Sequence, residues 1–253
     1  MHISIIGSGN VAWHIAQAAM QAGHCIDSIS SRTAEHAQVL ANAVGSVCCS
    51  IAEVPTDSDA YIIAVNDNAI AQVVAQLPKQ LEGVVMHTSG ATHISVLAAF
   101  ANYGVLYPCQ TISQSVAINY AQLPFLTEGN NEESALVVKN FAQSISSQVS
   151  VATSEQRCYL HVAAVMSSNF SNHLLWFTQQ YMQEHGLDFG LLRPLMEQTI
   201  YKAFSTDPYS AQTGPARRHD EATIATHKQL ISNKNMLSIY NLMTQSIENT
   251  YNK

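Results

Sequence analysis

A glycine-rich turn near the start of the chain has the spacing that lets backbone N–H groups hold a pyrophosphate. The sequence IIGSGNVA places Gly7, Gly9 and Ala12 between a short apolar run and a helical pattern. Gly7 would permit the tight turn, Gly9 would let a phosphate approach the backbone, and Ala12 would let the helix pack closely on the strand. The helix N-terminus then attracts the anion. The pattern favours dinucleotide binding over a tight turn without a ligand.

The residues around the second apolar run indicate which dinucleotide this turn would hold. An NAD site has an acid about 20 residues after the glycines, and Asp27 has that spacing but falls early in its run. At the end of the run the sequence reads SSRT, which places Arg32 between Ser31 and Thr33. An arginine flanked by hydroxyls suits a 2′-phosphate through charge-assisted hydrogen bonds. We therefore predict NADP as the cofactor. The alternative is that Arg32 is a solvated loop cation.

A second segment rich in reactive side chains lies near the C-terminus, where the sequence reads TGPARRHDEATIATH in a chain with only 11% charged residues. Asp220, Thr223 and His227 are spaced i, i+3, i+7 and so share one face of a helix. The carboxylate could orient the imidazole as a proton donor, and Arg217 or Arg218 could hold a substrate carboxylate. We expect the segment to close a substrate cleft opposite the nicotinamide. The alternative is that Asp220 only caps the helix.

A polar stripe follows the long helical pattern that starts after Thr153. At about 100° per residue, the residues on this stripe are Arg157, His161, Ser168 and Asn172. Polar groups along an apolar helix must be hydrogen-bonded or must face a wet cavity. The stripe therefore predicts one wall of the substrate cleft, with His161 as the candidate general acid. A polar contact with another helix or a dimer partner explains it equally well.

Short apolar runs and helical patterns alternate through about residue 150 and must position these groups. Runs expected to form strands lie at 3–6, 26–30, 46–48, 60–65, 84–87 and 105–107, and two more, around 124–129 and 148–153, flank a helix near 132–147. A helix over 10–22 follows the glycine turn and ends at Gly23. Such alternation implies a doubly wound parallel α/β sheet with right-handed crossovers.

The pattern changes after residue 152, where strand signals stop. A helix that begins with a capping box at Thr153 and Gln156 should run to about 185. A second helix capped by Asp188 should reach about 204, and two more should cover 221–231 and 235–251 after a loop over 205–215. We predict a dinucleotide-binding domain over 1–152 and an all-α domain for substrate binding and dimerisation over 153–253.

Composition argues against several classes of protein. The formal net charge is −7, with 11 basic and 18 acidic residues and no basic run, so nucleic-acid binding is not expected. No apolar run approaches the ~18 residues that span a membrane, and the N-terminus lacks the features of a signal peptide. We expect a cytoplasmic protein with no membrane partner. The 5 cysteines form no zinc pattern, so no metal is expected, and we interpret them as small buried apolar residues.

The motifs taken together resemble a known bacterial family. They are GSGNVA, SSRT, AVNDNAI, HTSGATHISVL, YGVLYPCQTIS, SEQRCYLHVAAVMSSNFSNHL and TGPARRHDEATIATH, in that order. The chain is similar over nearly its whole length to NADP oxidoreductases that have an N-terminal Rossmann-like domain and a C-terminal helical domain of unknown function. That family is related more distantly to pyrroline-5-carboxylate reductases and β-hydroxyacid dehydrogenases.

The resemblance implies further groups around the cofactor. AVND would border it through Val65 and Asn66, and HTSG through His87 and Thr88. YP would place Tyr107 and Pro108 beside the nicotinamide. His87 could instead be a hydrogen-bonded histidine at a strand end. The full cofactor set expected is Gly7, Ser8, Gly9, Asn10, Val11, Ser31, Arg32, Thr33, Val65, Asn66, His87, Thr88 and Pro108. The catalytic set expected is His161, Asn172, Asp220 and His227.

One departure from the β-hydroxyacid dehydrogenases bears on the reaction. Those relatives carry a catalytic lysine on the comparable long helix, and this chain has none between Arg157 and His185. Alcohol oxidation by that lysine mechanism is therefore not expected. The polar stripe favours an NADPH-dependent reductase of a small carbonyl or imine compound. The missing lysine leaves open the alternative of a non-catalytic NADP-binding sensor or regulatory protein. Four long helices with few charges also predict a homodimer through the helical half.

Overall fold

The computed structural model describes residues 1–251. The chain divides into two compact units, of which the first is Met1–Asn169 and the second begins at Phe170. The boundary expected after residue 152 falls just before helix α5 (Ser154–Ala164). The first unit therefore keeps this helix as well as the sheet, so that part of the predicted helical half belongs to the compact unit that holds the glycine turn.

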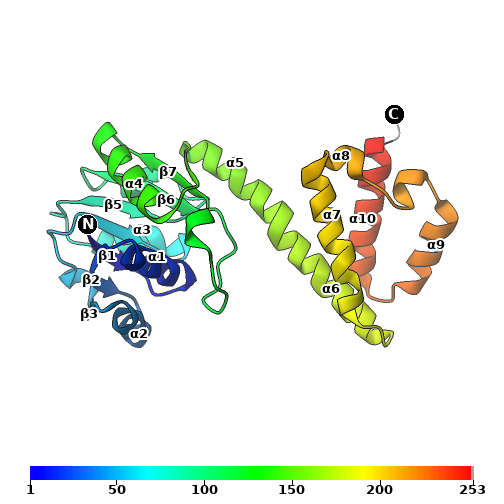
Figure 1. The fold of residues 1–253 in the computed structure, drawn as a ribbon, viewed down its shortest axis with the longest axis horizontal. Helices are drawn as coiled ribbons and strands as arrows, with labels where there is room; N and C mark the ends of the chain where they lie inside the picture. Colours follow the sequence, from blue (N-terminus) through cyan, green and yellow to red (C-terminus); the bar gives the residue numbers. More distant parts are fainter. Residues whose placement is uncertain (252–253) are drawn as a thin grey trace. The chain divides into compact units, whose positions relative to one another are not determined.

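An eight-stranded sheet in the order β3-β2-β1-β4-β5-β6-β7-β8 forms the centre of the first unit (Figure 1). Its strands are β1 (His2–Ile6), β2 (Cys25–Ser30), β3 (Val47–Cys49), β4 (Ala60–Ile63), β5 (Val84–His87), β6 (Tyr103–Pro108), β7 (Phe125–Gly129) and β8 (Val149–Val151). β1 to β6 pair in parallel. The chain reverses its direction of growth across the sheet between β3 and β4, which confirms the doubly wound, Rossmann-like prediction.

The last two strands depart from a fully parallel sheet. β6 and β7 pair in antiparallel fashion, with Pro108 opposite Phe125. Antiparallel partners can be joined at one end, so residues 109–124 connect them without crossing the sheet. β7 and β8 then pair in parallel, with helix α4 (Glu132–Ile145) between them in the sequence. The sequence predicted these elements but not the reversal.

Helices cover both faces of the sheet because side chains alternate along each buried strand. The helices are α1 (Asn10–Gln21), α2 (Ala34–Val44), α3 (Ile70–Gln76) and α4. One core cluster contains Ile5 and Ile62 together with residues of α1, α2 and α4. The other contains Ile6 and Ile63 together with residues of α3. Burial on both faces leaves the strand ends as the places where a ligand can reach the sheet.

The long helix expected after residue 153 is interrupted. α5 begins with the predicted capping box of Thr153 and Gln156. It gives way to a π-helical turn at Val165–Asn169, after which α6 (Phe170–Glu184) begins. A π turn holds more residues than an α turn, so a count at 100° per residue does not carry the polar stripe from His161 through to Asn172.

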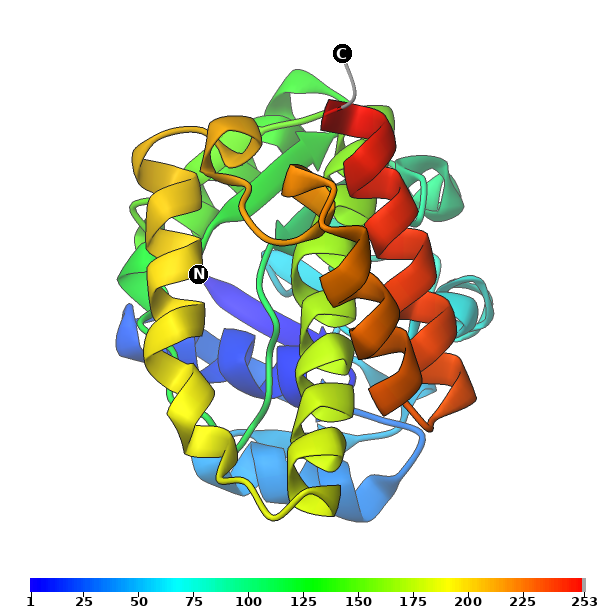
Figure 2. The ribbon, with the colours of Figure 1, turned by 90° about the vertical axis from the view of Figure 1, so that its right-hand side faces the viewer.

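The second unit is helical in the part of the chain that the structure describes. Its other helices are α7 (Arg193–Ser205), α8 (Pro208–Ala211), α9 (Glu221–Leu230) and α10 (Lys234–Tyr251). The expected loop over 205–215 contains the short helix α8, which Asp207 caps through the backbone N–H of Ser210. Figure 2 shows α9 beside α10, which a hydrogen bond joins. None of the helices within residues 1–251 is long and apolar enough to cross a membrane.

Candidate cofactor and substrate site

The glycine turn has the geometry that its spacing predicted. Gly7 has φ +131°, and a Cβ added there would lie 2.1 Å from the carbonyl oxygen of Ala64. Gly9 meets open space, with no atom within 4 Å of an added Cβ. Gly9 is also the N-cap of α1, which has no side-chain cap and no acid in its first turn. The first N–H groups of α1 are therefore available to an anion beside an uncovered backbone.

A cavity of about 1270 Å³ extends from this turn along the carboxyl ends of the parallel strands. Its lining contains nearly the whole cofactor set expected from the sequence, namely Gly7, Ser8, Gly9, Asn10, Val11, Ser31, Arg32, Thr33, Val65, Asn66, Thr88 and Pro108. The carboxyl edge is where open α/β sheets bind ligands. The structure therefore brings these residues to one cavity within the first unit.

The SSRT segment presents polar groups to this cavity. The Ser8 hydroxyl donates to the Ser31 hydroxyl at 2.8 Å. Thr33 is the N-cap residue of α2, but its side chain makes no capping hydrogen bond. Arg32 is exposed and has no acidic partner within residues 1–251. Asp27, the alternative ribose ligand, instead bonds to His2 and Ser58. The cavity is therefore lined by an exposed guanidinium that has no acidic partner among the described residues.

His87 does not line the cavity. Its side chain is fully buried, and its Nδ1 accepts a hydrogen bond from the Ser89 backbone N–H at 3.1 Å. Its Nε2 has no hydrogen-bond partner among the described residues. Burial, and then the nearby Arg157 guanidinium, lowers the pKa of His87 to about 3. His87 is thus a neutral histidine at a strand end, which is the alternative that the sequence left open.

His161 lines the cavity together with Tyr107. The Tyr107 hydroxyl lies 3.2 Å from His161 Nδ1. A Cβ at Gly90 would lie 2.7 Å from that nitrogen and 2.8 Å from Cζ of Tyr107, so Gly90 lets the two rings meet. Burial, with a smaller contribution from the Cys109 thiol, raises the pKa of Tyr107 to about 12. Tyr107 therefore keeps its proton at neutral pH and can donate it to His161.

The family resemblance placed Tyr107 beside the nicotinamide, at the carboxyl end of a parallel strand. It was not among the catalytic residues expected from the sequence, and its pairing with a histidine was missed. Its partner His161 lies 54 residues later, and single-sequence spacing cannot reveal such a contact.

Arg157 holds α5 against the sheet and does not enter the cavity. The side chain is fully buried and pairs with Glu128 of β7. Its Nε donates to the Ser89 carbonyl at 3.1 Å, and its Nη2 donates to the Thr92 carbonyl. These contacts fix α5 to the segment that contains Gly90. Arg157 thereby positions His161, which lies one turn further along the helix. Of the polar stripe expected from the sequence, Arg157 therefore packs against the sheet and His161 faces the cavity.

Residues after β6 complete the cavity near α1. The Asn10 side chain donates to the Ile112 carbonyl at 3.1 Å and accepts from the Gln114 backbone N–H at 3.3 Å. His14 bonds to the Ser113 carbonyl at 3.0 Å through Nε2. The segment held in this way adds Gln110, Thr111 and Ile112 to the lining. These residues belong to the family motif YGVLYPCQTIS, but the site expected from the sequence did not include them, because they form neither a strand nor a helix.

The remaining expected catalytic residues belong to the second unit. In that unit, Asp220 caps α9, accepting from the backbone N–H of Thr223 at 3.1 Å and from its hydroxyl at 2.7 Å. His227 Nδ1 bonds instead to the Tyr240 hydroxyl at 2.9 Å. No hydrogen bond joins Asp220 to His227 among the described residues, so the expected pair is not formed. A catalytic role for Asp220, His227 or Asn172 stays a prediction.

Comparisons with known protein families divide the chain into two matched regions. Residues 2–87 match the family described as "NADP oxidoreductase coenzyme F420-dependent". Residues 123–247 match the family described as "Domain of unknown function (DUF2520)". A search of curated proteins finds no match.

Solved structures match the chain over nearly its whole length. A protein from Bacteroides fragilis, described as an NADP oxidoreductase, is 33% identical, with 98% of each chain covered and a TM-score of 0.90. A reductive aminase from Aspergillus terreus, solved with NADPH and ethyl-5-oxohexanoate, is 18% identical, with 98% of this chain and 94% of that chain covered and a TM-score of 0.71. A 1-pyrroline-5-carboxylate reductase from Streptococcus pyogenes is 15% identical, with 98% of each chain covered and a TM-score of 0.62.

Proposed function

Because the chain belongs to the family of NADP oxidoreductases with a C-terminal domain of unknown function, we propose that it binds NADPH and reduces a small carbonyl or imine compound. One observation carries the proposal. A single cavity joins the glycine turn, the free guanidinium of Arg32 and the Tyr107–His161 pair. These are the parts that such a reductase needs: an anion site, a cofactor-selecting cation and a proton donor.

The order of the strands supports this placement of the cofactor. Arg32 follows β2, the glycine turn follows β1, and Pro108 ends β6, four strands along the sheet from β2. At about 4.8 Å between strands, this spans roughly 19 Å. A dinucleotide laid across the strand ends would have its 2′-phosphate at Arg32 and its pyrophosphate at the start of α1. Its nicotinamide would lie near Pro108 and Tyr107.

The chain's own residues would supply the proton for the reduction. NADPH, when bound, supplies the hydride to the carbon of the C=O or C=N bond. We assign protonation of the oxygen or nitrogen to His161, with Tyr107 donating to His161 Nδ1 and fixing the imidazole tautomer. In that tautomer His161 Nε2 carries the transferable proton. As this proton leaves, Nδ1 takes up the proton of Tyr107, and solvent later returns a proton to the Tyr107 oxygen. The reductive aminase solved with NADPH and a ketone-containing ester supports carbonyl and imine compounds as the first classes to test.

Cofactor preference tests the binding part of the proposal. Wild-type protein should bind NADPH more tightly than NADH. Arg32→Ala should lower the affinity for NADPH at least about tenfold, because a charge-assisted contact is lost. Arg193→Ala is the matched control, because Arg193 is an exposed arginine that pairs with Glu197 in the second unit. Thermal shift and calorimetry with both cofactors measure the effect. Equal affinity for the two cofactors, or an unchanged preference in Arg32→Ala, contradicts the assignment.

Turnover distinguishes the reductase from the non-catalytic sensor. Loss of NADPH absorbance should appear with a member of a panel of ketones, ketone–amine mixtures and cyclic imines. Tyr107→Phe should lower kcat about 10²-fold, within the range for removal of a proton-donating group, while NADPH affinity stays within about twofold. Tight NADPH binding with no turnover across the panel would instead favour the sensor.

We also propose that the helical unit joins two copies of the chain. The observation behind this proposal is large apolar side chains that the single chain leaves exposed on two of its helices, namely Leu195 (60%), Tyr201 (67%) and Phe204 (91%) of α7 and Leu242 (67%) of α10. Such side chains are typical of an interface. Light scattering should give a dimer mass, and Phe204→Glu should shift it to a monomer. A wild-type monomer at micromolar concentration contradicts the proposal.

A further inference from the structure

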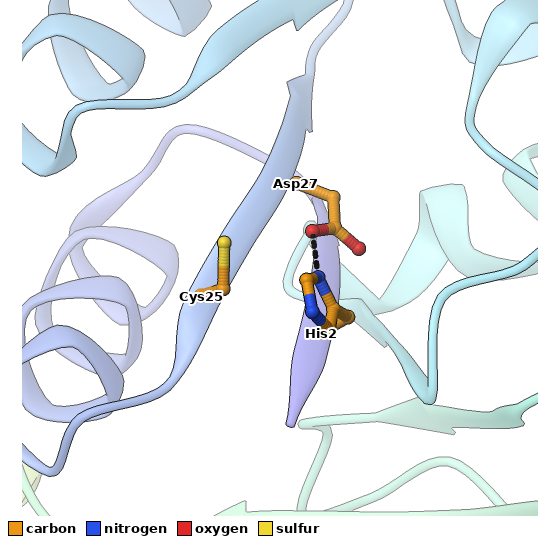
Figure 3. A group of neighbouring side chains, drawn as sticks. All are labelled: His2, Cys25 and Asp27. Atoms are coloured by element: carbon orange, nitrogen blue, oxygen red, sulfur yellow. Dashed lines mark hydrogen bonds and ion pairs between the residues drawn. The ribbon is translucent and has the colours of Figure 1, made fainter.

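Three potential metal ligands of different chemistry meet at the end of the sheet where β1 and β2 begin. They are the imidazole of His2, the thiol of Cys25 and the carboxylate of Asp27, whose ligand atoms all lie within 4.8 Å of one another. Figure 3 shows the Asp27 carboxylate directed at the His2 ring, with Cys25 on the same strand as Asp27. The glycine turn lies at the opposite end of the sheet, because β1 starts at His2 and leads into that turn after its last residue.

Strand pairing brings the three residues together. His2 pairs with Cys25 across the parallel strands, and Ile3 pairs with Ile26. The register then shifts, so that Ser4 pairs with Ser28 and Asp27 is the extra residue of a β-bulge. A bulge re-aims the side chain it contains, and here the carboxylate reaches His2 Nδ1 at 2.7 Å. The pairing of the two strands, and not a short spacing in the sequence, therefore brings the three ligands together.

A chain of buried hydroxyls orients the carboxylate. Ser58 donates to the second oxygen of Asp27 at 2.7 Å. The Ser28 hydroxyl donates to Ser4 at 3.0 Å, and Ser4 and Ser58 are 3.0 Å apart. All three serines are buried. Each hydroxyl donates its hydrogen to the next group, from Ser28 to Ser4, from Ser4 to Ser58 and from Ser58 to the Asp27 carboxylate. Such outer hydrogen bonds hold metal ligands in place, and they leave the first Asp27 oxygen, which contacts His2 Nδ1, to face an incoming cation.

The local charge favours a cation. The His2 backbone N–H donates to the Asp59 carboxylate at 2.7 Å. A hollow of about 320 Å³ beside two of the three ligands is lined by His2, Asp27, Pro55 and Asp57. Three carboxylates thus surround one imidazole, without a lysine or arginine in the lining of the hollow. A water molecule can complete a four-coordinate site.

We propose that His2, Cys25 and Asp27 form a binding site for a divalent cation of the zinc class. Nitrogen, thiolate and carboxylate ligands together suit Zn²⁺ better than Mg²⁺ or Ca²⁺, which prefer oxygen alone. Tetrahedral bonds of about 2.0–2.3 Å put ligand atoms about 3.3–3.6 Å apart. The His2–Asp27 contact must open by about 0.6 Å and the farthest pair must close by about 1 Å. The His2 side chain is 65% exposed and can make this movement.

Binding exchanges protons for the metal. The cation replaces the proton shared by His2 Nδ1 and Asp27, and the Cys25 thiol releases its proton to solvent as it becomes a thiolate ligand. No electron is transferred. The bound metal would join the starts of β1 and β2 without touching the cofactor cavity, so it would stabilise the first unit and leave NADPH affinity unchanged. The site is therefore independent of the proposed reductase activity.

Cobalt substitution tests the site in the full-length protein, without an affinity tag and under a reductant. Co²⁺ should give a thiolate-to-cobalt charge-transfer band in the near ultraviolet, which Zn²⁺ should abolish by competition. Cys25→Ser should remove the band, and Asp27→Asn should weaken Co²⁺ binding at least about tenfold. Cys158→Ser is the matched control and should keep both the charge-transfer band and the Co²⁺ affinity. Cys158 lies away from the proposed site, because its thiol contacts the Ala91 carbonyl in the segment that follows the carboxyl end of β5.

Zn²⁺ thermal shift provides a second readout that does not depend on cobalt spectroscopy. Zn²⁺ should raise the unfolding temperature of the wild type and of Cys158→Ser, and should not raise that of Cys25→Ser. A wild-type protein with no charge-transfer band, a band that survives Cys25→Ser, or an equal Zn²⁺ shift in Cys25→Ser and the wild type would each overturn the proposal.

Discussion

The buried His87 should make the first unit sensitive to acid in a way that one substitution can remove. An unfolded histidine has a pKa of about 6.5, whereas burial beside Arg157 lowers the pKa of His87 to about 3. The unfolded chain therefore binds a proton at this residue between pH 6.5 and pH 3, and the folded chain does not. Because the folded pKa is the lower one, stability is fully present above about pH 6.5 and falls as the pH decreases.

The expected loss can be worked out at a chosen pH. At pH 5 the unfolded histidine is almost fully protonated, and the folded one is neutral. The resulting cost is about 2 kcal/mol relative to pH 8. This figure depends on the unfolded pKa alone, because pH 5 lies well above 3. It therefore holds for any folded pKa comfortably below 5.

Urea unfolding at pH 8 and pH 5 measures this term. Trp13 of α1 reports on the first unit, and Trp176→Phe removes the other tryptophan. His87→Asn keeps an acceptor for the Ser89 N–H but cannot take up a proton. It should lose about 2 kcal/mol less than the parent between the two pH values. His36→Asn, at an exposed position of α2, should lose as much as the parent. Equal losses in His87→Asn and the parent would refute the reasoning.

Other substitutions test the contacts that build the cavity. Gly7→Ala forces a Cβ against a backbone carbonyl at a positive φ, so it should cost more than about 2 kcal/mol in urea unfolding; an Ala at this position with full stability contradicts the turn geometry. Glu128→Ala leaves the buried Arg157 without its carboxylate and should cost about 3 kcal/mol. The control Glu132→Ala, at an exposed position of α4, should cost less than about 0.5 kcal/mol. Gly90→Ala would push against His161 and should lower kcat more than it changes NADPH affinity; the reverse pattern would place Gly90 in the cofactor site instead.

Local patterns were sufficient to predict which residues gather at the cavity beside the glycine turn. The glycines, the SSRT segment and the strand ends each depend on a few consecutive residues, and a parallel sheet necessarily collects its carboxyl ends at one edge. The NADP oxidoreductase family and the fold class followed from the same motifs and are confirmed. The antiparallel β7 was missed because a 16-residue connection is compatible with either direction.

The contacts that the sequence could not predict are pairwise and distant. Arg157 looked like part of a cleft wall, yet it pairs with Glu128, 29 residues earlier. The π turn at Val165–Asn169 changed the helix phase without any proline or glycine to mark it. His2 and Cys25 form no metal-binding spacing in the sequence, because parallel pairing rather than a short loop brings them together.

The two outermost strands have a consequence for the behaviour of the folded protein at high concentration. An open sheet has two rows of unpaired backbone groups at its edges, and long edges recruit strands from other molecules. Here both outermost strands, β3 and β8, contain only 3 residues. Exposed valines lie on each, Val47 and Val151, so the side chains alone would not prevent such recruitment. The brevity of these strands limits the template to a few hydrogen bonds, which protects the first unit against edge-to-edge aggregation.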